Sequence, residues 1–410
     1  MQKYILLLGC FDTKGEAFAY LRARLLDQGE RVLTINTGVM GTTTDFPVDI
    51  EAEEVARAGG STLTELRQHH DRGRAVKVMG EGAASIIARL VAQGGLAAAI
   101  GMGGGGGTYI ALSAMQSIPM GVPKLCLSTL AVKDLSRQVG HKDITLMPSV
   151  VDVAGLNSIL KNLIAQAAAA IVAMSKVTTA EETTTGRIAI SMFGNTTACV
   201  DQCTALLKAR GYEVLAFHAN GVGGRAMEAL IREGCFEAVL DITTTELADD
   251  LCGGICSAGP DRLQAAAERG VPQVVAPGCL DMVNFAQPDT VPTPYQQREL
   301  YRWAPDVTLM RTNAEENQVL GQRLAQKLNR ATAPTAVVLP LKGLSQIDAE
   351  GGIFYRPEVD RVLFESIKSH LAAGVEVLEV DAHMNDPAFA AVLVQKLLEV
   401  LAKRSPKSVA

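Results

Sequence analysis

A run of five glycines is the most chemically informative stretch of this sequence. Residues 100–108 read IGMGGGGGT, with an apolar segment before them and a helical pattern, residues 109–117, after them. We predict that a buried strand ends here, that the chain turns, and that a helix begins. Glycine runs also form plain turns, but five in a row cost more conformational entropy than a turn needs. Because N–H groups at a helix N-terminus bind anions, we predict a phosphate-type ligand at Gly103, Gly104, Gly105, Gly106, Gly107 and Thr108.

Charged and hydroxylated residues follow two other predicted strands. Asp12, Thr13 and Lys14 come after residues 4–11, and Ser128 and Thr129 end the strand at 124–128. Ligands of open parallel sheets bind beyond the carboxyl ends of the strands, so these side chains are expected near the glycines. Lys14 would neutralise a phosphate and Asp12 would hold Mg²⁺ through water. Asp12 has an alternative role as a helix cap.

The glycine spacing does not by itself specify a dinucleotide. Gly101, Gly103 and Gly106 fit the pattern GxGxxG, which any glycine run satisfies. The acidic residue that NAD-binding sites carry at the end of the next strand is missing, since that strand ends in Ser128-Thr129. The motif GxxxxGK[ST] is also absent from the sequence. NAD and a Walker-type phosphate loop are therefore both disfavoured.

A second glycine-rich turn lies in the other half of the chain. It reads GVGGR and is followed later by a TTTE segment after another predicted strand, residues 238–242. An arginine beside glycines suits a phosphate or a carboxylate, although threonines also cap helices. We predict that a small acidic metabolite binds at Gly221, Gly223, Gly224, Arg225, Thr243, Thr244, Thr245 and Glu246.

Two histidines follow predicted strands and are candidate general bases. His218 and His383 would each be oriented by Asp241, Asp281 or Asp386. A histidine after a strand is also often a hydrogen-bonded structural residue. The candidate catalytic residues of the chain are Lys14, His218, Arg225, His383 and Asp386.

Composition indicates a well-packed α/β protein. The 410 residues are 48% hydrophobic and 20% charged, with a net charge of −6. The sequence contains no block of basic residues of the kind that binds nucleic acid. The N-terminus lacks the pattern of a signal peptide, and the Ala-rich segment 163–174 is too short to span a bilayer. We expect a cytoplasmic protein that binds neither nucleic acid nor membrane. The eight cysteines include no CxxC pair and are expected to be buried, reduced thiols.

The pattern of elements begins again in the middle of the chain. Residues 1–178 alternate strands and helices, with an irregular segment at 37–61 that reads as a long functional loop. After a polar stretch the order strand, polar turn, helix, glycine, strand recurs, with Phe11 matching Phe193 and Gly29 matching Gly211. We predict two consecutive Rossmann-like, three-layer α/β domains with mainly parallel sheets, at 1–178 and 187–410, joined by a linker at about 179–186.

The motifs in this order resemble the ATP-binding family that contains the inhibitory half of the tomato mosaic virus resistance protein and many uncharacterised bacterial relatives. The resemblance covers nearly the whole chain. The residues that carry it are 12–14, 101–108, 128–129, 147–152, 223–228, 241–246, 257–262, 281–285, 383 and 385–387. One departure is Leu130-Ala131-Val132-Lys133-Asp134, where the family is expected to have a small-residue turn.

The resemblance implies ATP with Mg²⁺ as the ligand and a dimer or larger homo-oligomer. It also implies that the plant relative carries a fused TIM-barrel-like domain, so this chain would work beside a separate TIM-barrel protein. We expect an ATP-binding protein that acts on or senses a small metabolite. Two alternatives remain open: a non-catalytic regulatory or scaffolding subunit of a barrel enzyme, and a coenzyme-A or acyl-group transferase. Whether the chain is an enzyme is left open.

Overall fold

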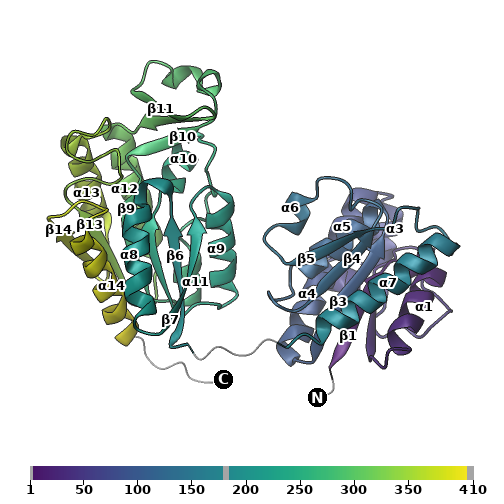
Figure 1. Ribbon diagram of the computed structural model, residues 1–410. Helices are drawn as coiled ribbons and strands as arrows, with labels where there is room; N and C mark the ends of the chain where they lie inside the picture. Colours follow the sequence, from purple (N-terminus) through teal and green to yellow (C-terminus); the bar gives the residue numbers. More distant parts are fainter. Residues whose placement is uncertain (1–2, 179–183, 404–410) are drawn as a thin grey trace. The chain divides into compact units, whose positions relative to one another are not determined.

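The chain folds as two compact units, Met1–Glu181 and Glu182–Ala410. The computed structural model describes residues 3–178 and 184–403 (Figure 1). Most of the predicted linker, residues 179–183, lies outside the described residues, and Gly186 already begins a strand.

The N-terminal unit is built on a five-stranded sheet in which all strands are parallel. The strand order is β2-β1-β3-β4-β5, so the chain runs to one side of β1 first and to the other side afterwards. The two central strands, β1 and β3, are continuously apolar because both faces of the sheet are covered. The strands are β1 (Tyr4–Gly9), β2 (Val32–Asn36), β3 (Leu96–Gly103), β4 (Lys124–Ser128) and β5 (Ile144–Pro148).

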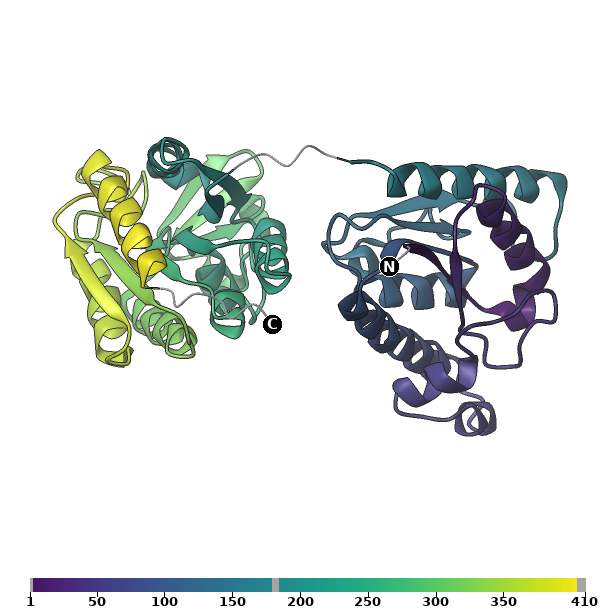
Figure 2. The ribbon, with the colours of Figure 1, turned by 90° about the horizontal axis from the view of Figure 1, so that it is seen from below.

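Helices cover both faces of this sheet and make the unit three-layered. One face packs against α1 and α7, and the other packs against α2, α4 and α5 (Figure 2). The helices are α1 (Phe11–Leu26), α2 (Ala52–Ala58), α3 (Leu63–Gln68), α4 (Arg72–Gln93), α5 (Gly105–Met115), α6 (Ser136–Val139) and α7 (Ser158–Ser175).

Two local predictions for this unit need correction. The segment 37–61 is not irregular throughout, because α2 forms within it and buries Ala52, Val55 and Ala56 against the core. The Ala-rich segment 163–174, which was expected to be too short to span a bilayer, lies within the longer helix α7. Its length and composition would allow it to cross a membrane. Its apolar face, including Leu160 and Ile164, packs against the sheet instead.

The C-terminal unit repeats this architecture with a six-stranded parallel sheet. The order is β14-β13-β9-β8-β6-β7. The strands are β6 (Gly186–Met192), β7 (Tyr212–His218), β8 (Ala238–Thr243), β9 (Gln273–Gly278), β13 (Thr335–Pro340) and β14 (Glu376–Val380). A small antiparallel sheet, which the sequence pattern did not predict, is formed by β10 (Met282–Phe285), β11 (Leu300–Ala304) and β12 (Val307–Arg311).

Helices again cover both faces of the large sheet. Helices α8 (Thr197–Lys208) and α14 (Pro387–Ala402) pack on one face. The other face is covered by α9 (Val222–Arg232), α10 (Glu246–Cys252), α11 (Ala265–Arg269), α12 (Ala314–Leu328) and α13 (Pro357–His370). The fold class is therefore as predicted: two consecutive Rossmann-like α/β units with mainly parallel sheets. None of the eight cysteines, all of which lie among the described residues, forms a disulfide.

Candidate functional site

The five glycines form the turn between β3 and α5. Gly103 ends the strand, Gly104 is the N-cap residue, and α5 begins at Gly105. Because Gly104 has no side chain, no side-chain hydrogen bond caps the helix. The first turn of α5 therefore presents backbone N–H groups that can bind an anion. We call residues 104–107 the glycine turn.

Packing explains only some of these glycines. A Cβ on Gly101 would lie 2.9 Å from the Cβ of Ala111, and one on Gly103 would lie 3.0 Å from the backbone of Gly107. These two positions must be small for α5 to approach β3. In contrast, a Cβ on Gly105 would meet no atom within 4 Å. The open space beside Gly105 is what a bound group would fill.

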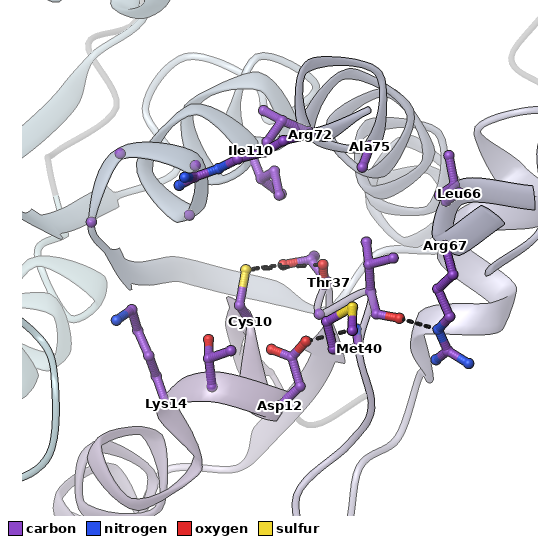
Figure 3. A pocket seen from close by; sticks show the side chains of 18 of the residues that line it. Cys10, Asp12, Lys14, Thr37, Met40, Leu66, Arg67, Arg72, Ala75 and Ile110 are labelled. Carbon is purple, nitrogen blue, oxygen red and sulfur yellow. Dashed lines mark hydrogen bonds between the residues drawn. The ribbon is translucent and has the colours of Figure 1, made fainter. Parts of the chain in front are cut away.

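A cavity of about 550 Å³ opens beside the glycine turn (Figure 3). Ligand pockets for small molecules have this size. The cavity lies at the carboxyl ends of β1 and β3, where the strand order reverses, which is where open α/β sheets bind ligands. We call it the glycine-turn cavity. Its lining includes Cys10, Asp12, Thr13, Lys14, residues 37–40, Leu66, Arg67, Arg72, Val76, Met102, residues 104–107, Ile110 and Asp152.

Two cationic side chains approach the glycine turn from different elements. Arg72 is the first residue of α4, and its Nη2 lies 3.7 Å from the position of a Cβ on Gly106. Within residues 3–178, Arg72 makes no hydrogen bond or ion pair. Lys14 comes from the first turn of α1, and its Nζ donates one hydrogen bond to the carbonyl oxygen of Val153 (2.7 Å). Figure 3 shows both side chains extending toward the glycine turn. Together they provide positive charge where a phosphate would contact the helix N-terminus.

Asp12 brings a carboxylate to the same cavity. Its Oδ2 accepts a hydrogen bond from the backbone N–H of Met40 (2.8 Å). Its Oδ1 is buried and has no hydrogen-bond partner among the described residues. A Cβ on Gly38 would collide with this carboxylate, so the loop after β2 needs glycine there. The Asp12 carboxylate is thus oriented by one hydrogen bond, while its second oxygen has no partner among the described residues.

No metal site is complete within the protein alone. In the described part of the chain, no three His, Cys, Asp or Glu side chains come close enough to hold a metal ion. Mg²⁺ usually binds one or two carboxylates together with substrate phosphates, and Asp12 fits that pattern. A metal here would therefore arrive with a phosphorylated ligand.

The neighbouring residues hold the loops that line the cavity. The buried Asn36 side chain accepts from the N–H groups of Phe11 and Gly38, which ties the start of α1 to the loop after β2. Arg67 Nε donates to the carbonyl oxygen of Val39 and anchors the same loop (Figure 3). Cys10 lies at the base of the cavity, where burial raises the pKa of its thiol, so in the free protein this thiol reacts more slowly than an exposed cysteine.

Some predicted residues line the glycine-turn cavity and others support it. Asp12, Thr13, Lys14 and the glycine turn line it, as predicted from the strand ends. Thr108 and Ser128 are buried and hydrogen bonded to each other (2.6 Å), so their hydroxyls brace the turn. Thr129 lies on a second cavity, on the other side of the turn. Arg72 and Asp152 were missed, although Asp71 in front of Arg72 is a recognisable helix cap.

In the C-terminal unit, the N-terminus of α9 already carries an anion. The Glu246 carboxylate accepts hydrogen bonds from the N–H groups of Gly221 (2.7 Å) and Gly224 (3.2 Å). A Cβ on Gly224 would collide with that carboxylate. Arg225 points elsewhere and donates to the carbonyl oxygen of Ser257. The GVGGR turn, with Gly221, Gly223, Gly224 and Arg225, is thus completed by the protein's own glutamate.

A buried arginine explains the neighbouring acidic residues. Arg262 is 1% exposed and contacts three carboxylates, those of Glu228, Asp241 and Glu246. Buried charges need such partners, because an unpaired charge in a protein interior is costly. Thr243, Thr244 and Thr245 are fully buried around this cluster. These groups bind one another, so the cluster is part of the buried structure of the C-terminal unit.

The two histidines have different surroundings. His218 is exposed at the end of β7, with its ring 5.4 Å from the ring of Phe193. His383 uses both ring nitrogens: Nε2 donates to the carbonyl oxygen of Ser345 (2.9 Å), and Nδ1 accepts from the N–H of Asn385 (3.1 Å). The Asp386 carboxylate accepts from the backbone N–H of His383 (2.8 Å). His383 and Asp386 therefore fix the turn between β14 and α14.

Buried carboxylates in the C-terminal unit make its stability depend on pH. Burial, together with Asp281 and Asp360, raises the pKa of Asp348 to about 9. Burial also raises the pKa of Asp249 to about 7. The folded state therefore binds more protons than the unfolded state above the ordinary aspartate pKa, and stability is lost as pH rises through the folded pKa.

We predict that the free energy of unfolding falls between pH about 4 and about 9. The variant Asp348→Asn removes the titration and should show a shallower decline. The difference between the two proteins should change by at least about 1.4 kcal/mol across this range, which is the free energy of one pKa unit. Urea unfolding followed by circular dichroism measures it. Parallel pH profiles for the two proteins would contradict the assignment.

Comparison with known proteins gives matches along the whole chain. Models of an uncharacterised protein family (UPF0261) match residues 3–180 with the N-terminal domain and residues 185–401 with the C-terminal domain. A UPF0261 protein of Clostridium tetani is 44% identical, over 98% of this chain and 100% of its own length. The ToMV resistance protein Tm-1(GCR237) of Solanum lycopersicum is 40% identical, over 82% of this chain and 45% of the tomato protein.

Among solved structures, one similar chain is a candidate UDP-N-acetylglucosamine 2-epimerase from Listeria monocytogenes. It aligns with 99% of this chain and 98% of its own length, at 11% identity and a TM-score of 0.23. A score this low carries no argument about fold or function.

Proposed function

This chain belongs to the UPF0261 family, and we propose that its N-terminal unit binds ATP with Mg²⁺ in the glycine-turn cavity. The family match confirms the resemblance to the tomato mosaic virus resistance protein and its bacterial relatives. The support for the ligand comes from the cavity itself. The proposals of a homo-oligomer and of a separate TIM-barrel partner remain predictions for the whole chain.

The observation that carries this proposal is the uncapped first turn of α5 beside two cations. Its N–H groups have no side-chain cap, Arg72 has no partner among residues 3–178, and Lys14 donates one hydrogen bond, to the carbonyl oxygen of Val153. A triphosphate can bind the helix N–H groups, Arg72 and Lys14 together, because it offers many acceptor oxygens and several negative charges. The glycine turn would hold the phosphates closest to Gly105 and Gly106.

The rest of the cavity suits a nucleoside. Its lining away from the turn is mainly apolar, with contributions from α3, α4, α5 and the loop after β2. Ligand pockets combine such apolar walls with a few polar groups that fix orientation. These apolar residues are Val39, Met40, Leu66, Ala75, Val76, Met102 and Ile110.

Asp12 is the residue of this cavity that would hold Mg²⁺. Its Oδ1 lacks a partner among the described residues, and a carboxylate oxygen is a ligand that Mg²⁺ prefers. When bound, the ion would neutralise charge on the phosphates. Met40 keeps the carboxylate oriented through its N–H. Asp12 would thus bind the metal, and Arg72 and Lys14 would bind the phosphates.

Cys10 provides a direct test of where the ligand binds. Because Cys10 lines the cavity, MgATP should slow its alkylation by N-ethylmaleimide several-fold. Cys235, which is partly exposed in the C-terminal unit, serves as the internal control and should react at an unchanged rate. Mass spectrometry of tryptic peptides measures both rates in one sample. Equal protection of both cysteines, or of neither at saturating MgATP, would place the ligand elsewhere.

A further inference from the structure

A second cavity lies on the other side of the glycine turn. It has a volume of about 630 Å³. It shares Gly104, Gly105 and Asp152 with the glycine-turn cavity. The two cavities therefore meet at the start of α5. We call the second one the hydroxyl cavity, and its lining is Gly104, Gly105, Ser128, Thr129, Val132, Pro148, Ser149, Val150, Val151 and Asp152.

The lining of the hydroxyl cavity indicates the charge of its ligand. Residues 3–178 contribute no lysine, arginine or histidine to this lining, and its one charged side chain is the carboxylate of Asp152. The Ser128 hydroxyl is hydrogen bonded to the Thr108 hydroxyl, and the Ser149 hydroxyl donates to the carbonyl oxygen of Val151. The Thr129 hydroxyl makes no hydrogen bond within those residues. An anion would meet no positive side chain here, whereas an uncharged alcohol would find hydroxyl and carboxylate partners.

Two exposed valines add an apolar rim to this cavity. Val132 is 77% exposed and Val150 is 78% exposed. Val150 has φ of 61°, a left-handed conformation that is unfavourable for a β-branched residue. It lies at the centre of a three-residue turn that is closed by the hydrogen bond from Val151 N–H to the carbonyl oxygen of Ser149. The turn holds an apolar side chain beside the polar lining, which suits a small polyol or another alcohol with an apolar face.

Asp152 lies where a proton acceptor would be needed. Asp152 borders both cavities and is exposed. Its carboxylate makes no hydrogen bond or ion pair with any residue between 3 and 178. The next residue, Val153, accepts the hydrogen bond from Lys14 Nζ. The segment that carries Asp152 is thereby tied to the residue that would bind phosphate. Asp152 is therefore positioned between a nucleotide phosphate and a ligand in the hydroxyl cavity.

We propose that the N-terminal unit is a phosphotransferase whose acceptor is a small uncharged alcohol bound in the hydroxyl cavity. This inference rests on the proposed binding of MgATP. A bond forms between the acceptor oxygen and the γ-phosphorus, and the bond from that phosphorus to the oxygen of ADP breaks. The hydroxyl proton moves to the Asp152 carboxylate and then to solvent, so the products are a phosphate ester, ADP and a proton. Lys14, Arg72 and the glycine turn hold the transferring group while Asp152 acts as the general base.

The test uses pairs of acceptors that differ in charge. The full chain is incubated with MgATP and glycerol or erythritol, and in parallel with the matched acids glycerate and erythronate. Phosphorus NMR identifies the products. We expect a phosphate ester with at least one polyol, at a rate at least ten times that with its acid. Transfer to neither polyol, or equal transfer to the acids, would overturn the inference.

The variant Asp152→Asn tests the role of the carboxylate. We expect the rate of transfer to fall by about 10²-fold or more, the contribution of a positioned general base, while MgATP affinity stays within about twofold. Asp152→Glu should recover part of the rate. The control is Asp134→Asn, since Asp134 is an exposed carboxylate that accepts a hydrogen bond from the N–H of Ser136 and lines neither cavity. An unchanged rate in Asp152→Asn would overturn the role of Asp152.

Calorimetry separates this inference from the proposal on which it rests. If the wild-type chain binds MgATP but transfers no phosphoryl group to the polyols, the phosphotransferase inference is wrong and nucleotide binding stands. If the chain binds no MgATP, the proposed function is wrong, and the inference fails with it.

Discussion

The variant Arg72→Gln is expected to bind MgATP about 10- to 100-fold more weakly than the wild-type chain, since hydrogen bonds to charged groups contribute about 1.5–3 kcal/mol. Arg72 reaches the glycine turn, and its guanidinium group makes no hydrogen bond or ion pair with any residue between 3 and 178. Its loss should leave the fold intact, because the side chain is exposed and begins a helix that Asp71 caps. Isothermal titration calorimetry measures the affinity, and thermal unfolding checks the fold.

Arg74→Gln is the matched control for Arg72. Arg74 lies two residues further along α4, is also exposed, and does not line the glycine-turn cavity. Both substitutions remove one positive charge from the same helix. If the two variants lost affinity equally, the effect would come from long-range charge, and a direct contact between Arg72 and phosphate would be excluded.

Substitution of Gly105 by valine is expected to reduce MgATP binding more than 100-fold, which corresponds to more than about 2.7 kcal/mol. A Cβ at this position meets no protein atom within 4 Å, so the added methyl groups would occupy the space where the phosphates are proposed to lie. The same openness means that packing in the free protein is undisturbed. Binding should therefore be lost while the midpoint of thermal unfolding changes little. Calorimetry and a thermal unfolding curve on the same preparation measure the two quantities.

The control for Gly105 is Gly374→Val in the C-terminal unit. Gly374 is a second glycine whose Cβ would meet nothing within 4 Å, and it lies far along the chain from the glycine-turn cavity. It should retain full affinity. Wild-type affinity in Gly105→Val would show that the phosphates do not occupy the glycine turn.

Much of the fold followed from the sequence because the strands are continuous apolar runs between glycine-rich turns. The run at Ile5–Leu8 is fully buried between two helical layers, as its composition predicted. The small antiparallel sheet was harder to predict. Its strand β11 is partly exposed and contains Arg302 and Trp303, so it lacks a clear apolar pattern. Helix α2 is only seven residues long and depends on tertiary packing for its stability.

The candidate site was only partly predictable. The glycine turn and Lys14 follow strands directly, so the rule about strand ends identified them. Arg72 follows a polar stretch and reaches the turn from α4, a placement that depends on how that helix packs on the sheet. Asp152 likewise reaches both cavities because of the turn at Val150. The left-handed backbone conformation of Val150 could not be predicted from its residue type.

The GVGGR turn shows why a glycine-rich motif is ambiguous. Its N–H groups bind an anion, as the pattern predicted, but the anion is the side chain of Glu246. The sequence contained that glutamate and could not show that it returns to the turn. The distinction between the two glycine-rich turns is therefore tertiary: one is filled by a carboxylate of the protein, and the other is open.

The central claim is that the N-terminal unit binds MgATP at the glycine turn. Its most direct test is calorimetric titration of the full chain with ATP, ADP and AMP, each with and without Mg²⁺. We predict a saturable isotherm with one site per chain for MgATP, weaker binding as phosphates are removed, and weaker ATP binding without the metal. The absence of binding by all three nucleotides, in both conditions, would contradict the claim.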